Sequence, residues 1–204
     1  SKRSMFDTAT TLLSKRAELT PDREALLDLA TGARYSYAAL NARANRAAHW
    51  LRAQGVGYGD RVSLLAHNGA PFVDLLFACG KIGAIFTPLN WRLAAAELLY
   101  IVGHCRPLVI VYGAEFAPVA DTLRAEHPAI AILAQSAYER ALAEQPAAEP
   151  ARPAELNAES PHAILYTSGT TGRPKGARIP QRQVLWNAIN TVISWGLTAD
   201  DCAP

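Results

Sequence analysis

One short segment carries residue types that can bind and neutralise phosphate groups. It runs from Tyr166 to Gly176 as Tyr-Thr-Ser-Gly-Thr-Thr-Gly-Arg-Pro-Lys-Gly, directly after an apolar run. Glycines let backbone N–H groups approach a ligand closely, hydroxyl groups donate to phosphate oxygens, and a lysine supplies a point charge. Successive backbone amides in such a loop form an anion-binding concavity. We therefore predict a loop that wraps a polyphosphate, with these binding residues: Thr167, Ser168, Gly169, Thr170, Thr171, Gly172, Lys175 and Gly176.

Two common phosphate-binding patterns do not fit this segment. A Walker A loop needs G-x-x-x-x-G-K-[ST], but Pro174 stands five residues after Gly169, and Gly176 follows Lys175. The dinucleotide pattern G-x-G-x-x-G occurs nowhere in the chain, and Ser168 lacks the G-x-S-x-G setting of a hydrolase nucleophile. The remaining alternative is a Ser/Thr/Gly-rich surface loop without a ligand. That alternative does not explain the presence of Lys175 in the segment.

The elements that must position this loop alternate along the chain. Short apolar runs predict strands at 61–66, 84–88, 108–112, 130–133 and 162–166. Between and around them, periodicity predicts helices at 5–19, 38–53, 94–104, 115–126 and 181–195, and a further helix that begins at residue 71. A hairpin is expected around residues 30–32. This alternation predicts an α/β fold with a largely parallel sheet and helices on both faces. The Pro-rich stretch 145–161 is expected to be an exposed crossover loop, with a domain boundary as the alternative.

Composition excludes several classes of function. The 204 residues are 50% apolar and carry a net charge of +2, which gives no electrostatic basis for binding nucleic acid. No apolar run approaches the roughly 18 residues of a membrane span, since Asp74 and Lys81 interrupt the most hydrophobic stretch, and no signal peptide is visible. The three cysteines lack CxxC spacing, which favours reduced thiols in the cytoplasm.

The remaining histidines and tryptophans suggest no separate chemistry. The five histidines are scattered without metal-site spacing. His104, beside Cys105 at a predicted helix end, is expected to have a capping or solvated role. The four tryptophans lie in apolar patterns, so packing is expected for all of them.

At the phosphate-loop residues the chain resembles a known family. Tyr-Thr-Ser-Gly-Thr-Thr-Gly-Arg-Pro-Lys-Gly is similar to the phosphate-loop signature of AMP-forming adenylating enzymes, which include acyl- and aryl-CoA synthetases, peptide-synthetase adenylation domains and luciferases. The stretches 35–40, 55–62 and 80–90 resemble earlier motifs of the same family, so nearly the whole chain aligns. The resemblance implies that residues 1–204 are part of the large N-terminal domain of the adenylate-forming fold.

The resemblance also implies a two-step reaction and its substrates. A carboxylate attacks the α-phosphate of ATP to give an acyl-adenylate and pyrophosphate, and the thiol of coenzyme A then displaces AMP. Lys175 and the loop amides would neutralise the departing pyrophosphate, while the Thr167 hydroxyl would approach Mg²⁺. Residues 88–93 resemble those of fatty-acyl ligases, whereas Pro180-Gln181-Arg182 resembles halobenzoate:CoA ligases, so both a fatty and an aromatic acid stay open.

Several motifs of the family do not occur in the 204 residues. The Tyr-Gly-x-Thr-Glu motif, the ribose aspartate and the C-terminal domain with its adenylation lysine are missing, so we expect an N-terminal fragment that is inactive alone. Such a fragment would expose surface and associate with itself, for instance as a homodimer. The alternatives are a non-catalytic nucleotide-binding module and a fragment of a peptide-synthetase adenylation domain.

Overall fold

Short runs of Val, Ile, Leu and Ala form the central sheet of the protein. The computed structural model describes residues 10–167, 173–198 and 201. The strands in this part of the chain are β1 (Glu24–Leu27), β2 (Arg34–Ser36), β3 (Arg61–Leu65), β4 (Ile85–Pro88), β5 (Val109–Tyr112), β6 (Ala131–Ala134), β7 (Pro161–Thr167) and β8 (Lys175–Pro180). Strands β1 and β2 pair as the expected N-terminal hairpin, and the others form one sheet.

The order of the sheet strands is β6-β5-β3-β4-β7-β8. The first five run parallel, while β8 returns antiparallel beside β7. The described helices are α1 (Thr10–Leu19), α2 (Tyr37–Ala53), α3 (Ala70–Ile82), α4 (Ala95–Cys105), the short 3₁₀ helix η1 (Ala114–Phe116), α5 (Ala117–Glu126), α6 (Gln135–Ala143) and α7 (Gln181–Trp195). This arrangement confirms the predicted α/β class with a largely parallel sheet.

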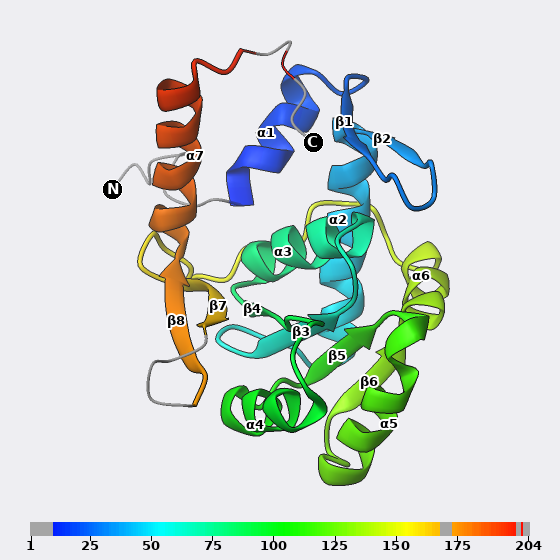
Figure 1. Cartoon of the computed structure of the whole chain (residues 1–204). Coiled ribbons are helices and arrows are strands. Elements are labelled where there is room, and N and C mark those ends of the chain that lie inside the picture. The colour runs from blue at the N-terminus through cyan, green and yellow to red at the C-terminus, as the bar shows by residue number, and fades with distance from the viewer. Residues whose placement is uncertain (1–9, 168–172, 199–200, 202–204) are drawn as a thin grey trace.

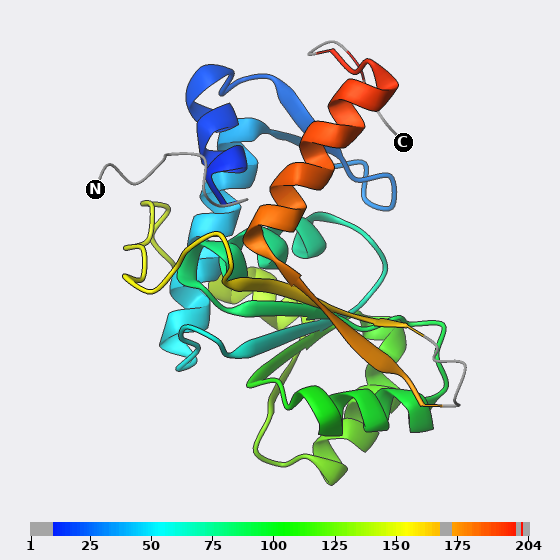
Figure 2. The ribbon, with the colours of Figure 1, turned by 90° about the vertical axis from the view of Figure 1, so that its left-hand side faces the viewer.

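Helices cover both faces of the sheet, as Figure 1 shows. Alternation along β5 separates the layers, because Val109 and Val111 pack with α2, α3 and α6, whereas Ile110 and Tyr112 pack with α4 and α5. The α3 helix is apolar on most sides and lies between the sheet and α2, as its composition predicts. In Figure 2 the α7 helix rises from the end of β8, away from this layered body. None of the described helices is both long and apolar enough to cross a membrane.

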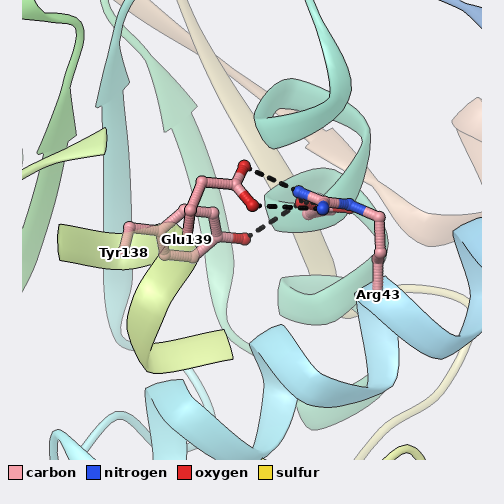
Figure 3. A network of polar contacts seen from close by, with 4 residues as sticks. Arg43, Tyr138 and Glu139 are labelled. Atoms are coloured by element: carbon pink, nitrogen blue, oxygen red, sulfur yellow. Dashed lines mark hydrogen bonds and ion pairs between the residues drawn. The ribbon is translucent and has the colours of Figure 1, made fainter. Parts of the chain in front are cut away.

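Two charged residues that interrupt the apolar sequence of α3 are buried in the structure. Asp74 is fully buried and accepts hydrogen bonds from Arg43 of α2, with Nη2 at 2.6 Å, and from the Tyr138 hydroxyl of α6 at 3.3 Å. Arg43 also donates to Glu139 at 2.8 Å, so this network joins three helices (Figure 3). Lys81 pairs with Glu149 at 2.5 Å and donates to Asn41. Both charges are therefore compensated inside the fold.

The Pro-rich stretch connects α6 to β7 without a helix or strand of its own between residues 145 and 160. Side chains of α2 hold its backbone: Asn45 donates to the Ala147 carbonyl at 2.9 Å, and the His49 ring nitrogen lies 2.9 Å from the Ala148 carbonyl oxygen. The stretch is thus fixed to the surface of the α2 and α3 layer.

Two elements were not predicted from the sequence. The α6 helix follows β6 with no intervening loop residue, which left residues 135–143 unassigned. The second element is β8, since residues 175 and 176 were expected to belong to the phosphate loop. They are instead the first residues of a strand that pairs with β7 over its whole length. The predicted helix at 5–19 is described from Thr10 onward, and the one at 115–126 is divided into η1 and α5.

Candidate functional site

The predicted phosphate loop connects the two strands of a hairpin. Thr167 ends β7 and lies opposite Lys175, the first residue of β8, while Tyr166 lies opposite Gly176. Thr167, Lys175 and Gly176 are all exposed at this end of the hairpin. The other predicted residues, Ser168, Gly169, Thr170, Thr171 and Gly172, lie outside the described residues. The structure therefore places Thr167 and Lys175 opposite each other at the two strand ends that flank the loop.

Tyr166 anchors the hairpin to α4. Its hydroxyl lies 2.5 Å from Nδ1 of His104, and burial raises the pKa of Tyr166 to about 12, so it stays a neutral hydrogen-bonding group. Tyr100 stacks on His104, and the guanidinium of Arg173 lies 5.8 Å from the centre of the Tyr100 ring. His104 thus holds the Tyr166 hydroxyl by a hydrogen bond. The sequence predicted only a capping or solvated role for this histidine.

Gly176 is needed because Tyr166 and Ile164 pack closely over the β8 backbone. A Cβ at this position would lie 2.9 Å from Cγ2 of Ile164 and 3.2 Å from Cζ of Tyr166. At the other end of the hairpin, the first N–H groups of α7 are satisfied, since Gln181 N donates to the Ser160 carbonyl at 3.0 Å. These contacts fix both ends of β8 relative to β7.

A crevice opens beside the hairpin at the carboxyl ends of β3, β4 and β7. The connection after β3 leads to α3 on one face of the sheet, whereas the connection after β4 leads to α4 on the other face. Divergent connections from adjacent parallel strands create the crevice in which open α/β folds bind ligands. The cavity there has a volume of about 280 Å³, and Asn68, Asn90, Trp91, Arg92 and Tyr166 are among its lining residues.

Aromatic and charged groups meet at the rim of this crevice. The Arg92 guanidinium lies 4.2 Å from the Trp91 ring centre, and the His67 ring packs edge-on against Trp91 at 4.4 Å. His67 Nε2 lies 3.4 Å from a carboxylate oxygen of Glu115. Packing was the only role expected for Trp91, although its position three residues after the predicted strand 84–88 places it near this edge of the sheet.

A second, more apolar cavity adjoins the crevice. It has a volume of about 550 Å³ and lies between α3, the sheet and α7, with Phe72, Pro88 and Leu165 lining both spaces. His162 lines it from the beginning of β7, and burial lowers the pKa of this imidazole to about 4. The histidine is therefore uncharged at neutral pH. No sequence pattern indicated this cavity.

A metal ion has few protein ligands in the described part of the chain. No group of three or more His, Cys, Asp or Glu side chains is placed there to hold one. Thr167 offers a single hydroxyl oxygen beside the loop, which fits an Mg²⁺ ion that takes its other oxygen ligands from phosphate groups and water.

Comparison with known proteins identifies a family. Residues 13–203 match the model of the AMP-binding enzyme family. The long-chain-fatty-acid–CoA ligase FadD13 of Mycobacterium tuberculosis is 37% identical over 93% of this chain and 37% of its own length. The indoleacetate–CoA ligase of Aromatoleum aromaticum is 37% identical over 81% of this chain and 34% of its own length.

A solved structure agrees with both the sequence match and the fold. The inhibitor-bound N-terminal domain of FACL13 from Mycobacterium tuberculosis is 35% identical, superposes with a TM-score of 0.83, and is matched over 96% of this chain and 48% of that one. The chain spans about a third of the length of these curated relatives. It belongs to the family of AMP-binding enzymes, among the relatives of acyl-CoA ligases.

Proposed function

We propose that the chain carries the ATP phosphate-binding part of an enzyme that activates a fatty or aromatic carboxylic acid. In the first step a carboxylate oxygen bonds to the α-phosphorus of ATP, and the bond to the bridging oxygen breaks so that pyrophosphate leaves with the electron pair. In the second step the thiol sulfur of coenzyme A bonds to the acyl carbon and its proton is released to solvent. The bond from that carbon to the phosphate oxygen breaks, and AMP leaves with the electron pair. The observation that carries this proposal is the pairing of Thr167 with Lys175 beside the crevice.

Each residue of the hairpin has a defined part in the proposal. Lys175 places a positive charge where the β- and γ-phosphates accumulate negative charge, which stabilises the leaving group. The loop glycines and hydroxyls, Ser168 to Gly172, supply N–H and O–H donors, and Gly176 keeps the strand close to Tyr166. The Thr167 hydroxyl would be the ligand that this chain offers to Mg²⁺. ATP, Mg²⁺, coenzyme A and the acid are then the small-molecule partners.

The proposal extends to the protein as a whole. We place residues 1–204 within a larger adenylate-forming domain, because the relatives are about three times as long as the part that matches. Contacts to adenine, ribose and the reacting acyl carbon would come from residues outside the 204. The chain alone is then expected not to adenylate an acid. The buried free thiols Cys79 and Cys105 fit a reducing compartment such as the cytoplasm.

Calorimetric titration of the chain with Mg²⁺-pyrophosphate tests the phosphate-binding part. Lys175→Met is expected to weaken binding by about tenfold or more, because a charge-assisted contact is lost. Arg178→Met is the matched control: it removes the same charge from the same strand, but from the opposite face of the hairpin. Equal loss in both variants, or loss only in Arg178→Met, contradicts the proposal. Carboxylate-dependent exchange of labelled pyrophosphate into ATP by the chain alone contradicts its expected inactivity.

A further inference from the structure

The phosphate-binding end of the hairpin projects beyond the ladder that joins it to the sheet. Strands β4 and β7 share one register pair, Phe86 with Ala163. In the described part of the chain, β7 from Ile164 to Thr167 has β8 as its only strand partner. Two strands that pair only with each other are marginally stable in water. Side-chain contacts with the rest of the fold must therefore help to fix this end of the hairpin.

The α4 helix holds the residue that precedes Thr167. The hydroxyl of Tyr166 lies 2.5 Å from Nδ1 of His104, and the two rings meet edge to face at 5.8 Å. The same tyrosine ring covers the backbone of β8, because a Cβ at Gly176 would lie 3.2 Å from its Cζ. Tyr166 thus links α4 to both strands of the hairpin.

The same face of α4 holds the segment that leads into the return strand. The guanidinium of Arg173, two residues before Lys175, lies 5.8 Å from the centre of the Tyr100 ring. Tyr100 stacks on His104, with the ring planes inclined by 16°. Because these two residues are four positions apart in the helix, both rings lie on one face of it. This face therefore contacts both arms of the hairpin.

The α4 helix is itself fixed to the central sheet. Leu98 and Val102 are buried in the core that α4 shares with β5 and α5. At the end of the helix, Arg61 of β3 donates to the carbonyl oxygens of Cys105 at 2.7 Å and Arg106 at 2.9 Å. These bonds satisfy acceptors that a helix leaves unpaired at its C-terminus. A contact with α4 therefore fixes the hairpin end relative to the sheet.

From these contacts, and resting on the proposed function, we propose that Tyr100 and His104 are positioning residues for phosphate binding. They act through the two hairpin residues that they contact, and so fix the strand ends that carry Thr167 and Lys175. Groups that are held in place before a ligand arrives bind it more tightly, because less conformational freedom is lost on binding.

Calorimetric titration with Mg²⁺-pyrophosphate tests this role. His104→Phe keeps an aromatic ring but removes the hydrogen bond, so it is expected to weaken binding by about three- to tenfold. His104→Asn keeps a hydrogen-bonding atom close to the position of Nδ1 and should restore most of the affinity. Tyr100→Leu should weaken binding by about two- to fivefold, whereas Tyr100→Phe keeps the ring face and should bind like the unaltered chain.

Two further variants separate positioning from a general loss of stability. Tyr166→Phe and His104→Phe remove the two ends of one hydrogen bond, so the double variant should bind pyrophosphate about as tightly as either single variant. Ile132→Val in β6, at the opposite edge of the sheet, removes one buried methylene group. It should unfold at a lower urea concentration but keep its pyrophosphate affinity.

The inference is overturned if His104→Phe and Tyr100→Leu bind pyrophosphate as tightly as the unaltered chain. It is also overturned if His104→Asn is as weak as His104→Phe, or if Ile132→Val loses as much affinity as they do. A loss in Lys175→Met alongside such a result leaves the proposed function standing. Absence of pyrophosphate binding by the unaltered chain would reject both.

Discussion

At the scale of single residues, Gly176 connects the loop chemistry to the packing of the sheet. It begins the return strand beside Lys175, and its missing side chain makes room for Ile164 and Tyr166. Tyr166 in turn is held by His104 on α4. A substituent at Gly176 would therefore displace the tyrosine and alter the strand end that carries Lys175.

Gly176→Ala is expected to destabilise the chain by about 1–3 kcal/mol, because the added methyl group overpacks the contact with Ile164 at 2.9 Å. Thermal or urea unfolding measures the change. Gly57→Ala is the matched control, since its Cβ would meet only a carboxylate oxygen of Asp60 at 3.7 Å. The same small loss in both variants would show that the close packing over Gly176 has no energetic consequence.

Some residues of the candidate site could be predicted from the local sequence, and others could not. The phosphate-binding role of Thr167 and Lys175 is a prediction from local sequence, because hydroxyls, glycines and a lysine within a few positions have a chemical meaning of their own. The contact of His104 was not predictable, since its partner Tyr166 lies 62 residues away in sequence. Local pattern carries no information about such pairs.

At the scale of elements, the alternation of short apolar strands and helices was sufficient to predict the parallel sheet. It failed for β8, whose sequence Lys-Gly-Ala-Arg-Ile-Pro has no apolar alternation and becomes a strand through its pairing with β7. It failed for α6, which starts immediately after β6 and has no side-chain N-cap. The apolar cavity was unpredictable for a related reason, because five elements contribute to its lining.

One buried charge network joins α2, α3 and α6 in addition to their apolar packing. Asp74 on α3 is fully buried, and burial raises its pKa to about 6 even though Arg43 and Tyr138 donate hydrogen bonds to it. Arg43 also reaches Glu139, so it is the cation that compensates two carboxylates. Removing it leaves Asp74 enclosed without a positive partner (Figure 3).

Arg43→Met is expected to lower the free energy of unfolding by about 3–5 kcal/mol near pH 8. The loss should be smaller at pH 5. Without Arg43 the pKa of Asp74 rises further above that of the unfolded chain, so the folded state holds a proton that the unfolded state releases, and rising pH then destabilises the fold. Urea unfolding at both pH values measures the difference.

Arg34→Met is the control for the loss of a charge, because its ion pair with Glu24 is exposed on both sides. Its cost is expected to stay below about 1 kcal/mol at either pH. An Arg43→Met effect that is as small as this control, or that grows toward low pH, would contradict the assigned role of the network.

At the scale of the whole molecule, α7 presents apolar side chains to solvent. Ile193 and Trp195 keep 72% and 73% of their surface exposed, and Trp186 keeps 58%. The helix rises from the end of β8, away from the layered body (Figure 2). Exposed apolar surface of this kind favours association with another protein surface. For the isolated chain, the available partner is a second copy.

The average mass in sedimentation equilibrium should therefore increase with protein concentration, and Ile193→Glu should reduce this increase because it places a charge on the associating face. Leu29→Glu is the comparison, since Leu29 is even more exposed than Ile193, at 86%, but lies in the β1–β2 hairpin turn. A chain that sediments as a monomer over the whole concentration range would refute the expected self-association.

The central claim is that the β7–β8 hairpin of this chain binds the phosphates of ATP. The most direct test is a map of amide NMR shifts during titration with Mg²⁺-pyrophosphate. We expect saturable shifts concentrated in residues 167–176, greatly weakened in Lys175→Met and preserved in Arg178→Met. The absence of saturable shifts, or shifts centred on Arg61, Arg106 and Arg178 on the α4 side of the sheet, would contradict it.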